Sequence, residues 1–133
     1  MLLALAEQQG IRSDVIPSIA TGFCGGMSRT GNLCGAVSGG VMALGLAFGR
    51  HTPQDSREPA YIAVQAFLSG FEARFGSLTC PGLTGCHLGT PEGMEKFQQL
   101  RSTIDCSCFV AEAAQLAYAL IIAAQKENPD ESN

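Results

Sequence analysis

The chain has 133 residues, of which 46% are hydrophobic and 15% charged, a composition typical of one globular domain. Its net charge of −4 and its only two lysines, Lys96 and Lys126, argue against binding to nucleic acids or to anionic membranes. The opening MLLALAEQQG has no basic region and no cleavage signature, so we expect no signal peptide and a cytoplasmic location.

The first part of the chain predicts two helices followed by a loop. Residues 2–9 are apolar and stop at Gly10, and Asp14 is placed to cap a second helix that ends near Phe23. Residues 25–32, GGMSRTGN, carry three glycines and are expected to form an irregular loop.

The next segment predicts a buried helix at the centre of the fold. Residues 33–48 are apolar on all sides, and Asn32 is placed to cap them. This run of sixteen residues is shorter than the roughly 20 that a membrane span requires, so we expect no membrane insertion. Glycines at or near one-turn spacing would let a neighbouring helix or a ligand approach closely: Gly35, Gly39, Gly45 and Gly49.

The second half of the chain predicts three further helices. The first begins at Asp55 or Ser56, ends before Gly76, and has an apolar face formed by Ile62, Phe67, Leu68, Phe71 and Phe75. Residues 76–90 are expected to be irregular, and helices follow over residues 91–101 and 103–125. We therefore predict an all-α bundle of five to six helices around the glycine-rich one. Residues 1–126 would form one domain, and 127–133 a disordered tail.

Cys34 is the most conspicuous candidate for chemistry among the six cysteines. It lies in the first turn of the predicted central helix, where the amide groups and the dipole of a helix N-terminus favour a thiolate. A thiolate is both a nucleophile and a metal ligand. The alternative is that Cys34 is a small buried apolar residue.

The last helix separates Cys106 from Cys108. Two residues on a helix are about 200° apart, so the two side chains face opposite ways and cannot pair with each other. Cys106 shares its side of the helix with Phe109 and Ala113, so we expect Cys106 to meet Cys34 in the interior.

The irregular segment adds Cys80, Cys86 and His87. Cys80 and Cys86 could close a small disulfide loop or supply metal ligands, while His87 is expected to face solvent and His51 to lie in a polar loop. No C-x-x-C pair, phosphate-binding G-x-x-x-x-G-K-[ST] or helical E-x-x-H motif occurs in the sequence.

The motif Cys34-Gly35-Ala36-Val37-Ser38-Gly39 lies within GFCGGMSRTGNLCGAVSGGVMALGL and is followed by FEARFGSLTC and by a late cysteine before VAEAAQLA. This arrangement resembles the C-GCAxxG-C-C family of proteins, which are proposed to be redox-active. The resemblance covers nearly the whole chain and matches Cys34, Cys80 and Cys106 to three of the four family cysteines.

The fourth family cysteine belongs on the first helix, but this chain has no cysteine before Cys24. The resemblance therefore implies either an incomplete set of cysteines or one in which Cys24 takes the missing place in space.

We expect a redox-active protein that, if it is an enzyme, is a thiol-dependent oxidoreductase. In this reading the Cys34 thiolate attacks the substrate, and Cys80 or Cys106 then forms a disulfide with Cys34. Its electron donor or acceptor is unknown, and a tight homodimer would also suit the glycine-rich helix. One alternative is a zinc or iron–sulfur module that uses Cys34, Cys80 and Cys106, with Cys24 and Cys86 as weaker candidates. Another is a non-catalytic helical interaction protein whose cysteines fill the core.

Overall fold

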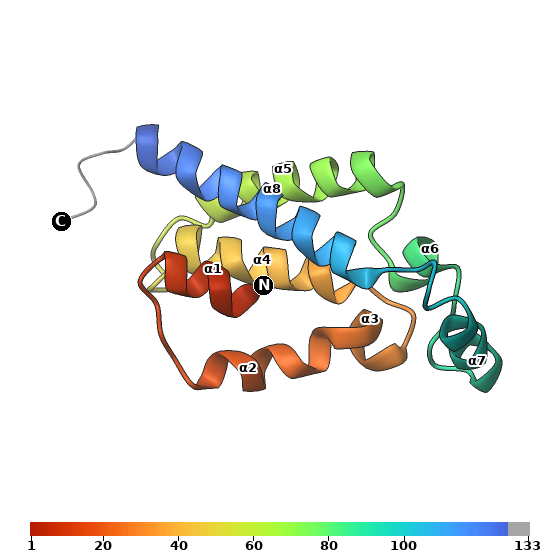
Figure 1. Ribbon diagram of the computed structural model, residues 1–133. Coiled ribbons are helices and arrows are strands. Elements are labelled where there is room, and N and C mark those ends of the chain that lie inside the picture. Colours follow the sequence, from red (N-terminus) through yellow and green to blue (C-terminus); the bar gives the residue numbers. More distant parts are fainter. Residues whose placement is uncertain (128–133) are drawn as a thin grey trace.

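A computed structural model describes residues 1–127 and shows an all-α fold, as the sequence predicts. Helices stack in layers, with α5 (Glu58–Phe75) and α8 (Cys106–Glu127) on one side and the segment around α2 (Val15–Ala20) on the other (Figure 1). Among the described residues no β-strand occurs. The sequence predicted a disordered tail over residues 127–133. Glu127 is instead the last residue of α8, and residues 128–133 lie outside the described part of the chain.

The remaining helical segments are short, apart from α4 (Gly35–Phe48). They are α1 (Leu2–Gln8), the 3-10 turn η1 (Thr21–Phe23), α3 (Cys24–Arg29), α6 (Cys80–Thr84) and α7 (Pro91–Gln99). The described residues thus contain more helical segments than the five to six predicted. One reason is α6, which lies within residues 76–90, a stretch predicted to be irregular.

The core forms where α4, α5 and α8 pack against one another. The glycine-rich helix α4 also contacts α1, α3 and η1, so elements surround it on several sides. Fully buried side chains come from all three long helices: Val37, Leu44, Phe67, Phe71, Ala113 and Ala117. Ile62 was predicted on the apolar face of α5, but it is 64% exposed and points away from this core.

The central helix begins two residues later than predicted. Leu33 pairs with Thr79 in an isolated antiparallel β-bridge, and Cys34 has an extended backbone with φ −59° and ψ 139°. Cys34 is therefore the N-cap of α4, and Asn32 does not cap it. The side-chain amide of Asn32 donates instead to Thr30 Oγ1 at 2.8 Å.

Local capping explains the other helix boundaries. The side chain of Thr79 accepts a hydrogen bond from the amide of Gly82 and so caps the start of α6, and Gly85 ends this helix in the left-handed conformation. Both signals are present in the sequence, but our prediction of an irregular segment overlooked them. Helix α8 begins at Cys106 rather than at residue 103, because the carboxylate of Asp105 accepts from the amide of Ser107 at 2.9 Å.

One described helix, α8, is long and apolar enough over Cys106–Lys126 to cross a membrane. The same helix packs against α4 and α5 and buries Ala113, Ala117 and Ile121. Length and composition alone are therefore weak evidence for membrane insertion, and the fold is compatible with a soluble protein.

Two glycines of α4 allow a direct test of this packing. A Cβ added at Gly40 would collide with the ring of Phe67, whereas one added at Gly45 would meet nothing within 4 Å. We expect Gly40→Ala to lower the free energy of unfolding by about 1–3 kcal/mol through overpacking. Gly45→Ala should raise it by about 0.5–1 kcal/mol, because alanine favours a helix more than glycine does. Urea denaturation of both variants checks this, and equal effects would contradict the packing around α4.

Candidate functional site

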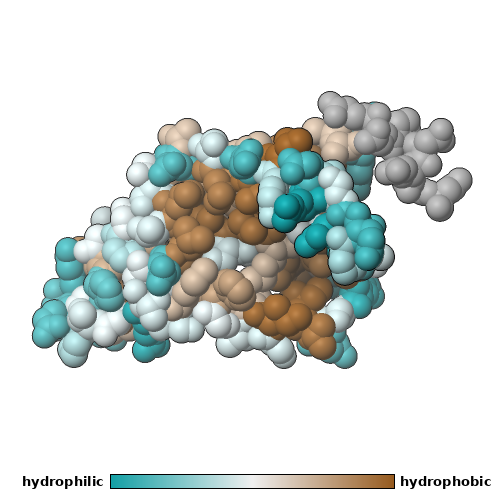
Figure 2. Space-filling model, turned by 180° about the vertical axis from the view of Figure 1, so that it is seen from behind, coloured by the Kyte–Doolittle hydropathy of each residue, from teal (hydrophilic) through white to brown (hydrophobic). Residues whose placement is uncertain are grey.

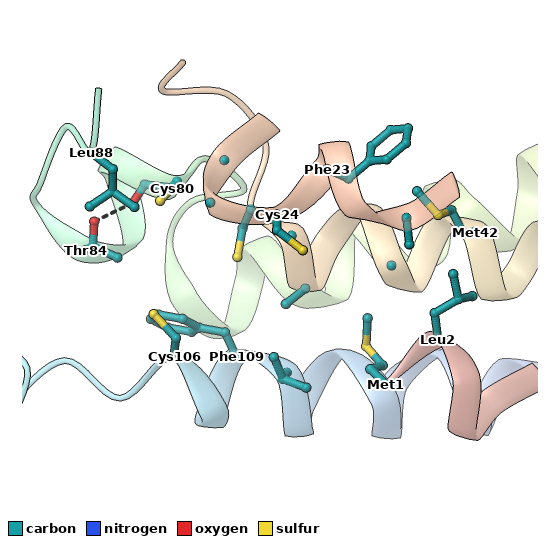
Figure 3. Close-up of a pocket in the computed structure, with 18 of the residues that line it drawn as sticks. Met1, Leu2, Phe23, Cys24, Met42, Cys80, Thr84, Leu88, Cys106 and Phe109 are labelled. Atoms are coloured by element: carbon teal, nitrogen blue, oxygen red, sulfur yellow. Dashed lines mark hydrogen bonds between the residues drawn. The ribbon is translucent and has the colours of Figure 1, made fainter. Parts of the chain in front are cut away.

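Four of the six cysteines line one cavity of about 530 Å³ at the head of α4: Cys24, Cys34, Cys80 and Cys106. They come from four different elements, namely α3, the N-cap of α4, α6 and α8. Figure 3 shows Cys24 and Phe23 on one side of the cavity, Cys106 and Phe109 on α8 across from them, and Cys80 at one end. All six cysteines are free thiols in the structure.

Backbone hydrogen bonds fix Cys34 beside Cys80. The amide of Cys34 donates to the carbonyl of Leu78 at 2.9 Å, and the amide of Cys80 donates to the carbonyl of Asn32 at 2.9 Å. These bonds flank the Leu33–Thr79 bridge, and side chains alternate between the faces of paired segments. Cys34 and Cys80 consequently lie on the same face, as diagonal neighbours.

The glycine-rich loop forms a left-handed turn that closes one wall of the cavity. Residues 25–29 all have positive φ, between 50° and 70°. Gly26 needs to be glycine for two reasons, its φ of 67° and its contact with Cys80, whose Cβ lies 2.5 Å from the place of an added methyl group. The same conformation costs about 1–2 kcal/mol for a residue with a side chain, such as Met27. The loop therefore stores strain where it supports Cys24.

Gly35, the second residue of the CGAxxG motif, allows Cys24 to approach the head of α4. A Cβ at Gly35 would lie 3.3 Å from Cys24 Cα and 3.4 Å from the carbonyl oxygen of Phe23. The close approach that we predicted for the glycines of this helix thus occurs at Gly35, and it brings a fourth cysteine to the cavity.

Cys106 is the first residue of α8 and lines the cavity, whereas Cys108 does not. This agrees with the predicted facing of the two side chains. Cys106 is nevertheless exposed, whereas we expected an interior position. The reason is that it lies on the first turn of α8, and the buried residues of this helix, Ala113 and Ala117, lie about two and three turns further along the chain. Its exposed surface belongs to the open cavity.

Cys86 and the two histidines lie outside the cavity. Cys86 is only 2% exposed, and its amide and carbonyl both hydrogen-bond to the hydroxyl of Thr84. His87 is exposed, as predicted, and His51 lies in the polar loop before α5. These positions give Cys86 a structural role next to Cys80.

Burial suppresses ionisation of two of the cavity thiols. Desolvation, followed by the neighbouring Cys34, raises the pKa of Cys80 above its ordinary value of 9.0 and outweighs a hydrogen bond from Thr84. Desolvation also raises the pKa of Cys106, with Cys34 as the next cause and Arg101 as a smaller opposing one. Cys34 thus contributes to the raised pKa of both thiols.

The sulfur atoms do not form a ready-made metal site. Within residues 1–127 no group of three or more His, Cys, Asp and Glu side chains lies close enough together to hold a metal ion. A structural zinc ion takes four such ligands.

Sequence reasoning missed the apolar part of the cavity. Its wall includes Phe23, Met42 and Phe97, from three separate elements. No local pattern predicts that these residues share a surface. Among the apolar residues of the wall, only Phe109 was placed next to a candidate cysteine by the sequence, because it follows Cys106 on the same face of α8.

The raised pKa of Cys80 gives the stability of the protein a pH dependence. The folded state keeps this proton to higher pH than the unfolded chain does, so the contribution is complete below pH 9.0 and is lost as pH rises through the folded-state pKa. In urea titrations under reducing conditions, Cys80→Ala should flatten the decline in unfolding free energy above pH 9. Cys108→Ala should keep the wild-type decline. An unchanged slope in Cys80→Ala would contradict the assignment.

Comparison with known proteins supports the resemblance seen in the sequence. A family model described as "Putative redox-active protein (C_GCAxxG_C_C)" matches residues 1–120. Searches of curated proteins and of solved structures find no significant match. The family match covers all four cysteines of the cavity and most of the described helices. The chain belongs to the C_GCAxxG_C_C family.

Proposed function

We propose that the protein is a thiol-dependent oxidoreductase in which Cys34 is the nucleophile and Cys80 or Cys106 the resolving thiol. The observation that carries this proposal is the cavity itself, which gathers cysteines from four separate elements into one apolar space. The family description, which names redox activity, supports the same class of chemistry.

Cys34 suits the role of nucleophile because of its place in the backbone. It is half-buried and caps a helix of 14 residues, whose first amide groups have no partner within the helix. Such amides stabilise a thiolate. The carbonyl of Cys34 accepts from the amide of Ser38 at 3.0 Å, so the residue is held firmly at the helix start.

Two thiols are placed to resolve the product. Cys80 is 8% exposed and is fixed on the same face of the bridged segments as Cys34. Cys106 is more accessible and approaches from α8. Desolvation raises the pKa of both, so each is protonated at neutral pH, and the partner thiolate released in the first step of the reaction can take up the proton of the resolving thiol.

The proposed reaction is a thiol–disulfide exchange. The Cys34 thiolate attacks one sulfur of a partner disulfide, forms a mixed disulfide and releases the first partner thiolate. The resolving thiolate then attacks Cys34 Sγ, forms the intramolecular disulfide and releases the second partner thiolate. In total the protein loses two electrons and two protons, and the partner disulfide gains them. A dithiol of this kind stays reduced in the cytoplasm, the location that we propose.

The alternatives receive less support from the geometry. Zinc or an iron–sulfur cluster would need three or four cysteines within bonding distance of the metal, and the described residues contain no group placed closely enough to hold a metal ion. A purely structural role fits Cys86, but Cys24 and Cys106 are exposed, so these two thiols do not fill the core. Cys34 packs against the core and also lines the cavity.

Counting thiols tests the proposal directly. Oxidation of the reduced protein by a mild disulfide should remove two free thiols per chain, and a reductant should restore them. Cys34→Ser should abolish this change, and the matched variant Cys108→Ser should retain it. Comparing Cys80→Ser with Cys106→Ser identifies the resolving thiol.

Elemental analysis of the same anaerobic samples separates the proposal from its main alternative. Stoichiometric zinc or iron together with shielded thiols would overturn the disulfide mechanism. Six free thiols in both states would overturn redox activity altogether.

A further inference from the structure

The cavity beside the thiols has the size of a binding site for a small molecule. Its volume of about 530 Å³ lies within the range of roughly 300–1,000 Å³ that is typical of ligand pockets. Apolar side chains from α1, α2, α4, α7 and α8 complete the wall around the cysteines. Figure 3 shows Met1, Leu2 and Met42 at the end of the cavity away from Cys80. The thiols therefore face a space that can hold a ligand of more than a few atoms.

The side chains that line this cavity carry no charge. Among the described residues, no Asp, Glu, Lys, Arg or His side chain contributes to it. Arg101 and Asp105 act on Cys106 from nearby, with opposite signs, but neither lines the cavity.

Apart from the cysteines, the polar side chain in the wall is Thr84. Its hydroxyl donates to the carbonyl of Cys80 at 2.8 Å and accepts from the amide of Cys86 at 3.2 Å, so its hydrogen bonds are used within the protein. A ligand with carboxylates or phosphates would lose its hydration here and meet no cationic side chain, which is strongly unfavourable.

These observations narrow the class of molecule that exchanges electrons with the thiols. We propose that the cavity binds a small, uncharged, apolar two-electron carrier of the quinone class as the redox partner of Cys34 and its resolving thiol. This inference rests on the proposed function and adds a second redox partner, whose hydroquinone form would reduce the intramolecular disulfide that the exchange with a partner disulfide creates.

The electron balance of such a reaction is complete. Two S–H bonds break and one S–S bond forms, which releases two electrons and two protons. The two carbonyl oxygens of the quinone take up both electrons and both protons, so that a hydroquinone leaves. In the reverse direction a hydroquinone would reduce the disulfide. Neither direction creates a net charge inside the cavity, in keeping with its uncharged wall.

A fully substituted quinone is the appropriate probe, because its ring has no free carbon for thiol addition. Reduced protein is mixed anaerobically with tetramethyl-1,4-benzoquinone or, separately, with glutathione disulfide, which carries charge. Loss of thiols and formation of hydroquinone are followed over time. Binding of tetramethylhydroquinone to the reduced protein is measured by calorimetry, since this product cannot oxidise thiols.

Two substitutions on α8 make a matched pair. Val110 lines the cavity and is 39% exposed, whereas Tyr118 is 43% exposed and lies outside it. We expect Val110→Glu to weaken hydroquinone binding and to slow oxidation by the quinone by about tenfold or more, through the cost of a carboxylate beside an apolar ligand. Oxidation by glutathione disulfide should slow by a smaller factor, because this charged oxidant does not depend on binding of an apolar ligand in the cavity. Tyr118→Glu should alter none of these quantities.

A second charge, Met42→Glu on α4, provides an independent test of the same cavity from another helix. Thermal melting of each variant shows whether it is folded. If no hydroquinone binds, or if both lining variants bind it as the wild type does, the inference is overturned, even where glutathione disulfide still oxidises two thiols. If hydroquinone binds but neither oxidant changes the thiols, the redox role and the proposed function are overturned together.

Discussion

The pairing of two short backbone segments, residues 32–34 and 78–80, fixes the positions of Cys34 and Cys80 at the cavity. Two hydrogen bonds of 2.9 Å join them, from Cys34 to Leu78 and from Cys80 to Asn32. This small antiparallel bridge delays the start of α4 until Gly35 and begins α6 at Cys80. Because of it, two helices start side by side, and each presents a cysteine at its first turn.

The small residues of α4 bring the remaining parts of the site to the same place. Gly40 accepts the ring of Phe67 and so joins α5 to the core, while Gly35 admits the backbone of Cys24. Much of the surface on the side away from the view of Figure 1 is apolar (Figure 2). Close packing around one glycine-rich helix thus leaves a cavity at its head, which is lined by four thiols and by uncharged side chains.

Much of the fold was predictable, because it depends on local signals. Gly76 stops α5, and Thr90 caps α7 by accepting from the amide of Gly93, as its place before Pro91 suggested. The start of α4 was predicted wrongly. Asn32 is a good helix cap in isolation, but its backbone carbonyl accepts a hydrogen bond from the amide of Cys80 in the pairing with residues 78–80, and the helix starts later. Hydrogen bonds between segments far apart in the chain produce no periodic pattern in the sequence from which they could be predicted.

The site was predictable only in part. The facing of Cys106 and Cys108 follows from helix geometry alone, and the structure places only Cys106 at the cavity. The contribution of Cys24 depends on a left-handed turn of residues 25–29, in which Met27, Ser28 and Arg29 adopt a conformation unusual for their type. No propensity predicts such a turn.

The most direct test of the central claim is to map the disulfide in the oxidised protein. Oxidised chains would be alkylated, digested without reduction and analysed by mass spectrometry. The account predicts a cross-linked peptide pair in which Cys34 is joined to Cys80 or to Cys106, with Cys86 and Cys108 alkylated. Recovery of Cys34 as a free thiol in fully oxidised protein, or a bond between other cysteines alone, would contradict it.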